Sequence, residues 1–187
     1  MNQEELDIIL ENHGKWLRNE GGDRADLSNA DLKNTNLRFA NLRLAYLRGA
    51  YLSYANFRGV DLRFADLKNT NLRFANLSYA NLSNADLSNV NLSNANFRGV
   101  DLSDANLNWV NWQHVEGLTV ICVQVDTTRK NNQIAYIKEL DIWITGCFQG
   151  TLDELKASVE QTHKDNEKLR KRYYRVIDFI LNEVAEE

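Results

Sequence analysis

An apolar residue, leucine in most repeats, recurs at every fifth position from Leu27 to Trp112. The residue two places before it is small (Ala, Thr or Val), and the residue between the two is Asp or Asn except at Tyr46 and Tyr51. An internal repeat of this regularity limits the architectures that the chain can adopt more than any other feature of the sequence.

A period of five excludes both an ordinary helix and a straight strand. On an α-helix, five steps carry a side chain about 140° beyond a full turn, so the leucines would spiral around every face. On a straight strand, an odd step moves each leucine to the opposite face. A chain that turns a corner once per repeat keeps the leucine and the small residue inside and Asp or Asn outside. The corners are rich in Asn, Asp, Ser and Gly, which suit turns.

The segment ADLSNADLKNTNLRFANL and its continuation resemble the pentapeptide-repeat family, whose pattern is small residue, Asp or Asn, Leu or Phe, polar, variable. The match covers about Ala25 to Trp112. The resemblance implies an all-β solenoid, a right-handed quadrilateral β-helix with four pentapeptides per coil. Residues 20 apart would then share a side. Members recur in bacteria and phages, so the resemblance also implies a bacterial or phage accessory protein.

Thirteen residues occur twice without change, at Ala30–Leu42 and Ala65–Leu77. The shift of 35 residues is seven repeats, which places the second copy on a neighbouring side of the implied coil. A binding site would not survive that rotation. We therefore interpret the copy as duplicated building material.

Three parts are expected along the chain. Residues 1–24 hold a capping helix and a turn, residues 25–117 the repeats, and residues 118–187 a small α+β cap, because both ends of a stacked coil need covering. The N-terminal helix is predicted over residues 2–12, with an apolar face of Leu6, Ile9 and Leu10, and Trp16 and Leu17 follow it.

The C-terminal part is predicted to contain a strand over 118–125, a polar turn over 126–133 and one or two further strands over 134–148. A capping box opens a helix at Thr151, and a second helix runs over about 165–184. Its apolar residues form one stripe, either a homodimer face or a face that packs on the module's own hairpin: Leu169, Tyr173, Val176, Ile180 and Val184.

No signature of catalysis is present. His13, His114 and His163 are far apart, and the chain has no glycine-rich phosphate loop, nucleophile elbow or Cys-x-x-Cys. We predict a non-enzymatic protein without catalytic, cofactor-binding or metal-binding residues. Cys122 and Cys147 lie in apolar segments and are predicted to be buried free thiols.

The predicted location is cytoplasmic. Residues 1–11 carry four acidic residues and no basic one, unlike a secretory signal. No apolar run reaches the roughly 18–20 residues that a membrane span needs.

Binding is the remaining class of function. Some pentapeptide-repeat proteins mimic DNA and modulate a type II topoisomerase such as gyrase, which requires dense negative charge. Residues 26–117 carry eight acidic and nine basic side chains, a net charge of +1, so this sequence departs from such mimics. The charge is uneven, because residues 31–73 have a net charge of +5 and residues 76–117 of −3.

The basic half is interleaved with aromatic residues and contains a candidate binding patch: Arg38, Arg43, Tyr46, Arg48, Tyr51, Tyr54, Arg58 and Arg63. Such a patch could bind an acidic protein or nucleic acid. Alternatively, the arginine stems simply cover the rings. The sequence therefore predicts a protein–protein interaction module, with a gyrase-directed DNA mimic and a nucleic-acid-binding protein as alternatives.

Overall fold

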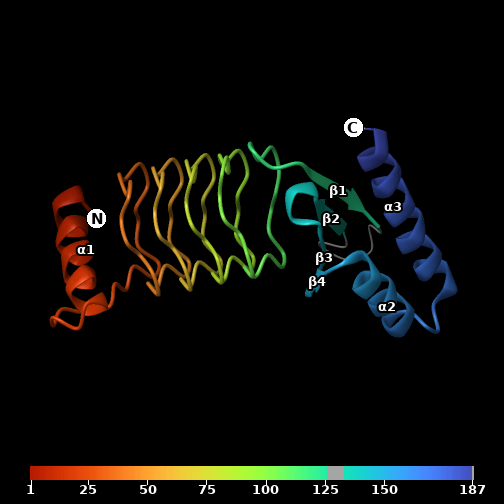
Figure 1. Cartoon of the computed structure of the whole chain (residues 1–187), viewed down its shortest axis with the longest axis horizontal. Helices are drawn as coiled ribbons and strands as arrows, with labels where there is room; N and C mark the ends of the chain where they lie inside the picture. Colours follow the sequence, from red (N-terminus) through yellow and green to blue (C-terminus); the bar gives the residue numbers. More distant parts are fainter. Residues whose placement is uncertain (126–132, 187) are drawn as a thin grey trace. The chain divides into compact units, whose positions relative to one another are not determined.

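The computed structural model describes residues 1–125 and 133–186 of the 187-residue chain. They form two compact units, Met1–Gly117 and Leu118–Glu187, and each is described by itself. The first unit consists of helix α1 (Gln3–Leu17) and the coils of the repeat (Figure 1). Apart from Gln133, which begins a strand, the predicted polar turn over 126–133 lies outside the described residues.

Parallel bridges join residues 20 apart, from Asp26 with Tyr46 to Asn96 with Glu116. The Leu27 N–H donates to the Tyr46 carbonyl at 2.7 Å, and the Tyr46 N–H donates to the carbonyl of the residue before Asp26 at 3.0 Å. Four pentapeptides therefore complete one coil, and the prediction that residues 20 apart share a side is confirmed.

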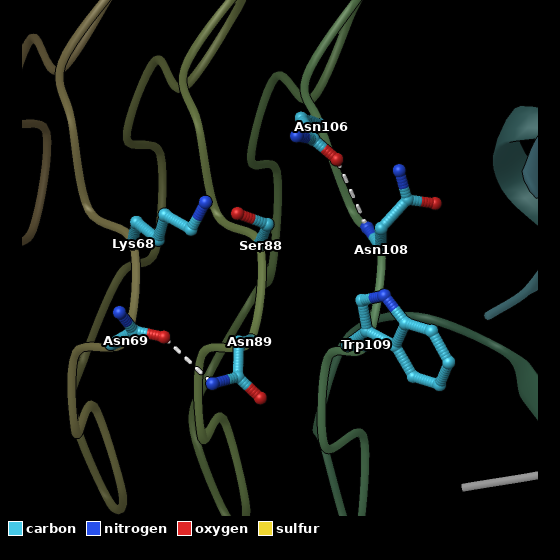
Figure 2. Close-up of a pocket in the computed structure, with 7 residues that line it drawn as sticks. All are labelled: Lys68, Asn69, Ser88, Asn89, Asn106, Asn108 and Trp109. Carbon is cyan, nitrogen blue, oxygen red and sulfur yellow. Dashed lines mark hydrogen bonds between the residues drawn. The ribbon is translucent and has the colours of Figure 1, made fainter. Parts of the chain in front are cut away.

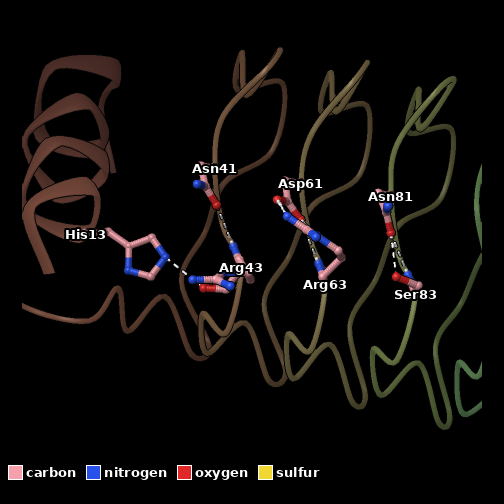
Figure 3. Close-up of polar contacts among 7 residues, drawn as sticks. All are labelled: His13, Asn41, Arg43, Asp61, Arg63, Asn81 and Ser83. Carbon is pink, nitrogen blue, oxygen red and sulfur yellow. Dashed lines mark hydrogen bonds and ion pairs between the residues drawn. The ribbon is translucent and has the colours of Figure 1, made fainter. Parts of the chain in front are cut away.

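Each pentapeptide ends in a tight turn. The Asn or Asp before each leucine accepts a hydrogen bond from the N–H two places on, as Asn41 Oδ1 does from Arg43 N at 3.2 Å (Figure 3). The last residue of each turn has a left-handed φ, between 54° and 70°. Gly59 occupies one such position, and a Cβ there would stand 2.6 Å from the Phe39 ring, so glycine also makes room for that ring.

Side chains of α1 supply hydrogen bonds that a preceding coil would otherwise make. Gln3 donates from Nε2 to the Asn36 carbonyl and accepts from the Asn36 N–H at Oε1, both at 3.2 Å. His13 is fully buried: Nδ1 accepts from the Ala25 N–H at 3.0 Å, so Nε2 donates to the Arg43 carbonyl at 3.1 Å (Figure 3). The first coil is therefore covered by polar as well as apolar contacts.

Helix α1 is longer than predicted. A capping box between Asn2 and Glu5 starts it, and it continues through Trp16 and Leu17, which were expected to follow it. Leu6 of the predicted apolar face is fully buried.

The second unit is a four-stranded antiparallel sheet with strand order β1-β2-β3-β4 and two helices. The elements are β1 (Val120–Gln124), β2 (Gln133–Ile137), the 3₁₀ helix η1 (Lys138–Leu140), β3 (Ile142–Thr145), β4 (Phe148–Gly150), α2 (Leu152–Thr162) and α3 (Glu167–Glu186). The segment predicted as one or two strands contains β2, β3 and the start of β4, because turns at Asp141 and Gly146, both with positive φ, interrupt it. The predicted capping box at Thr151 is confirmed.

The stripe on α3 packs inside its own unit, against one face of the sheet. Tyr173 and Ile180 belong to the core with Tyr136 and Trp143, and the other stripe residues pack against that core: Leu169, Val176 and Val184. Of the two predicted roles, packing on the unit's own sheet accounts for the stripe residues in this structure, and the homodimer face stays a prediction.

Both cysteines are free, as predicted, but they are exposed rather than buried. Cys122 lies between Ile121 and Val123, which pack against the core. Because side chains alternate along a strand, Cys122 points to the other face of β1. Within the described residues, no helix is long and apolar enough to cross a membrane.

Candidate functional site

The 20-residue coil distributes the predicted binding patch around all four sides. Steps of five residues move each successive pentapeptide to the next side, and only residues 20 apart stack. The eight residues fall into four groups of two, one for each side: Arg38 with Arg58, Arg43 with Arg63, Tyr46 with Arg48, and Tyr51 with Tyr54. They do not form one patch.

Two of these residues form side-chain hydrogen bonds among the described residues, and Arg38, Arg58, Tyr51 and Tyr54 each contact a ring or a cation of a neighbouring residue. The Arg63 guanidinium donates to both carboxylate oxygens of Asp61, at 2.9 and 2.7 Å, and these hydrogen bonds lower the pKa of Asp61 (Figure 3). The Arg24 guanidinium lies 3.7 Å from the centre of the Tyr46 ring and donates to its hydroxyl at 2.6 Å. Arg63 and Tyr46, which the sequence placed in the candidate binding patch, therefore already bond to other side chains of the same chain.

One side of the coils, here called the asparagine side, differs from the other three. Its outward residues in four successive coils are all amides: Asn36, Asn56, Asn76 and Asn96. Each amide oxygen accepts a hydrogen bond from the N–H two places on, at 3.0–3.3 Å, which leaves the amide NH₂ to donate outward. The next residue of this column is Glu116, and the other three sides carry Asp in this position in at least one coil.

Arginines stand at both edges of the asparagine side. Arg73 lies in the turn that precedes it, and Arg38, Arg58 and Arg98 lie in the turns that follow it. All four are exposed, and none forms an ion pair within the described part of the chain. The edge turns between residues 33 and 99 contain no carboxylate, so this side is basic although the whole chain has a net charge of −4.

Exposed aromatic rings accompany these arginines. Tyr54 and Phe74, one coil apart on the first edge, stack with ring centres 4.8 Å apart. Phe39 and Tyr79 on the second edge are 67% and 58% exposed. The guanidinium of Arg38 lies 5.3 Å from the centre of the Phe39 ring. This contact agrees with the alternative prediction that arginines cover the rings.

These four rings occupy left-handed backbone positions, with φ between 57° and 62°. Such a position costs a bulky residue on the order of 1–3 kcal/mol. Asn and Gly fill the same position elsewhere in the repeat at lower cost. The exposed rings are therefore not explained by the needs of the turn.

The sequence interpretation did not include Arg73, Arg98 or Tyr79 in the patch. It followed charge along the chain, where these residues lie beyond or at the end of the basic half. Comparing every twentieth residue would have brought them together. The asparagine side offers donors, positive charge and rings, and these suit binding to a surface rich in acceptors. Among the described residues, no group of three His, Cys, Asp or Glu side chains could hold a metal ion.

Comparisons with known proteins agree with the repeat. The family model described as Pentapeptide repeats matches residues 25–63, 55–94 and 65–104. The chain is similar to solved pentapeptide repeat proteins from the Arabidopsis thaliana thylakoid lumen (33% identity, TM-score 0.48) and from the cyanobacterium Cyanothece 51142, named Rfr23 (37%, TM-score 0.48). Each match covers 49% of this chain and 63% of the other, less than two thirds of its length.

A more distant likeness is to QnrB1, a plasmid-mediated fluoroquinolone resistance protein, with 22% identity over 53% of this chain and 69% of that one, and a TM-score of 0.21. At such scores, these likenesses identify no partner for this chain. No curated protein matches the sequence, and no family of enzymes is indicated.

Proposed function

The chain belongs to the pentapeptide-repeat family through residues 25–104, and on this premise we propose that it is a non-enzymatic interaction module whose asparagine side binds an acidic protein surface. The observation that carries the proposal is the set of four exposed arginines that form no ion pair with any described residue, flanked by exposed rings. The right-handed sense of the coil, a cytoplasmic location and a bacterial or phage source are parts of the same proposal.

The chemistry of the asparagine side selects the partner. Arg and aromatic residues are enriched in the centres of protein interfaces, where they supply most of the binding free energy. The outward amide NH₂ groups and the guanidinium groups are all donors, so the partner must present carboxylates or carbonyl oxygens. Long-range attraction to an acidic surface would also speed association at low salt.

A second candidate is nucleic-acid binding, which the stacked pair Tyr54–Phe74 favours. Rings that repeat along a basic surface can stack on bases while arginines contact phosphates. DNA mimicry toward a type II topoisomerase is the weaker alternative, because the asparagine side has the same sign of charge as the DNA-binding surface that a mimic would have to occupy.

A pull-down of the tagged chain from bacterial lysate, with and without nuclease and read by mass spectrometry, tests the proposal. The variant Arg38→Glu/Arg58→Glu reverses two charges in adjacent coils of the asparagine side. The control Arg48→Glu/Lys68→Glu reverses two charges in equivalent positions of another side.

The expected result is a nuclease-resistant partner with an acidic surface, lost with the first variant and kept with the control. Its affinity for the purified chain should fall steeply with salt. Recovery that nuclease abolishes would favour nucleic acid, and topoisomerase subunits would favour mimicry. Equal recovery with both variants would overturn the role of the asparagine side.

A further inference from the structure

A different side of the coils contains a pocket of about 360 Å³ (Figure 2). Lys68, Ser88 and Asn108 line it from the same position of three adjacent coils, and Trp109 lines it beside Asn108. The volume lies within the range of pockets that bind small molecules.

Two polar atoms of this pocket are buried without a hydrogen-bond partner among the described residues. They are the Ser88 hydroxyl oxygen, in a side chain of a residue that is only 6% exposed, and Asn108 Oδ1. Figure 2 shows the Ser88 hydroxyl pointing toward the Lys68 side chain across the coils. Buried polar groups of proteins are almost always hydrogen-bonded, so in this arrangement the two atoms are open to a partner such as water or a ligand.

The neighbouring amides are already held in place. Asn89 donates to Asn69 Oδ1 at 2.6 Å, and Asn106 donates to Asp86 Oδ1 at 3.1 Å. These bonds join adjacent coils, so the wall of the pocket is ordered before a ligand arrives. A pre-organised wall lowers the free-energy cost of binding.

The unused groups define the chemical class of the ligand. Asn108 Oδ1 needs a donor, the Lys68 ammonium needs an acceptor, and the Ser88 hydroxyl can take either. An anion that only accepts hydrogen bonds would leave Asn108 Oδ1 unsatisfied and would lie on the side that carries Asp86. A hydroxylated neutral ring supplies both donors and acceptors, and its C–H face can lie on the indole of Trp109, which is 42% exposed.

We propose that this pocket binds a neutral sugar ring. The site is independent of the asparagine side, because the two lie on different sides of the coil and share no residue. Since the pocket is open and shallow, affinity for a disaccharide is expected in the millimolar range, which corresponds to about −4 kcal/mol.

The test follows the indole N–H signals of the four tryptophans by NMR on the ¹⁵N-labelled full chain. The variant Trp109→Asn identifies the Trp109 signal and keeps the left-handed turn, because Asn89 and Asn69 occupy the same position one and two coils before it, respectively. The probes are cellobiose, maltose and N,N′-diacetylchitobiose, with adenosine and inorganic phosphate as alternatives.

At least one disaccharide should shift the Trp109 signal saturably, and Ser88→Ala should weaken that binding about tenfold. The matched control Ser93→Ala removes a hydroxyl of similar burial from a neighbouring side and should leave the affinity unchanged. A shift with adenosine or phosphate alone, no shift with any disaccharide, or equal affinity in Ser88→Ala would each overturn the assignment.

Discussion

The two units of this chain bury apolar side chains in opposite ways. In the coils, the inward leucines are buried in a stack whose adjacent coils are joined by backbone bonds between residues about 20 apart. In the second unit, the core gathers Trp143 from the sheet, Leu155 from α2 and Ile177 from α3. Stability in the coils is therefore a sum of neighbour contacts, whereas the second unit depends on one shared core.

This difference also separates binding surface from scaffold. The coil places every twentieth residue in one column, so residues of one kind that recur every 20 positions form a continuous surface. The asparagine side and the sugar pocket are both of this kind. The second unit has no such repetition, and its charged and apolar residues are positioned by the packing of α2 and α3 on the sheet.

The largest effect should follow from removing the centre of the shared core. Trp143→Ala should destabilise the second unit by about 3–5 kcal/mol, because the ring is almost fully buried and leaves a cavity. Hydrogen exchange should show loss of protection throughout β1–β4, α2 and α3 together, with protection kept in the middle coils. Equal loss in the coils would mean that the two units unfold as one, contrary to this comparison.

A matched cavity in the coils should behave differently. Leu72→Ala should cost about 3 kcal/mol, because Leu72 is fully buried and its coil is held open by backbone bonds such as Leu72 N–H to the Asn91 carbonyl at 2.9 Å. Exchange protection should fall most in the mutated coil and less with each coil away from it. A uniform loss over all coils would contradict the neighbour-contact picture.

The same difference explains what could be predicted from the sequence. Leu72 and Asn41 belong to a pentapeptide pattern that occurs eighteen times. The inward position of Leu72 and the turn at Asn41 could therefore be predicted from the pattern alone. Cys122 was misplaced because an edge strand with one covered face cannot be told from a buried strand by apolar content. His13 was passed over because its partners, Ala25 and Arg43, are distant in sequence.

The candidate site was partly predictable for a related reason. Arg38 and Arg58 were paired correctly, because a 20-residue step follows from the family. Charge counted along the chain nevertheless mixes residues of all four sides and leaves Arg98 out of the basic half. No feature of the sequence marked the Ser88 hydroxyl, which has no hydrogen-bond partner among the described residues, because other serines at equivalent positions, such as Ser93, find a partner.

A smaller effect should have opposite signs in the two units. Leu44 has a left-handed φ of 67°, so Leu44→Asn should stabilise the coils by about 1 kcal/mol. Leu181, partly exposed in α3, has helical neighbours, so Leu181→Asn should destabilise the second unit by about 0.5 kcal/mol. Denaturant midpoints of the two variants against the parent chain would measure both. Changes of the same sign would show that the turn stores no strain at Leu44.

The smallest effect concerns pH and should be confined to the N-terminal end of the coils. Burial lowers the pKa of His13, and the nearby Arg24 and Arg43 lower it further. A protonated ring would also turn Nδ1, which accepts from the Ala25 N–H, into a donor. Because the unfolded chain takes up the proton more readily, the folded state loses stability as the pH falls through about 6.5, the usual pKa of histidine.

Exchange protection of the first coil, followed between pH 7.5 and 5.5, should therefore decrease toward low pH, while the middle coils stay unchanged. Asp26 and Asp31 in the same coil do not interfere, because hydrogen bonds from Ser28 and Lys33 lower their pKa values away from this range. His13→Gln should abolish the dependence, and His114→Gln should preserve it. If the pH dependence persists in His13→Gln, another group titrates. The hydrogen bonds of His13 to Ala25 and Arg43 would then not be the cause of the acid sensitivity.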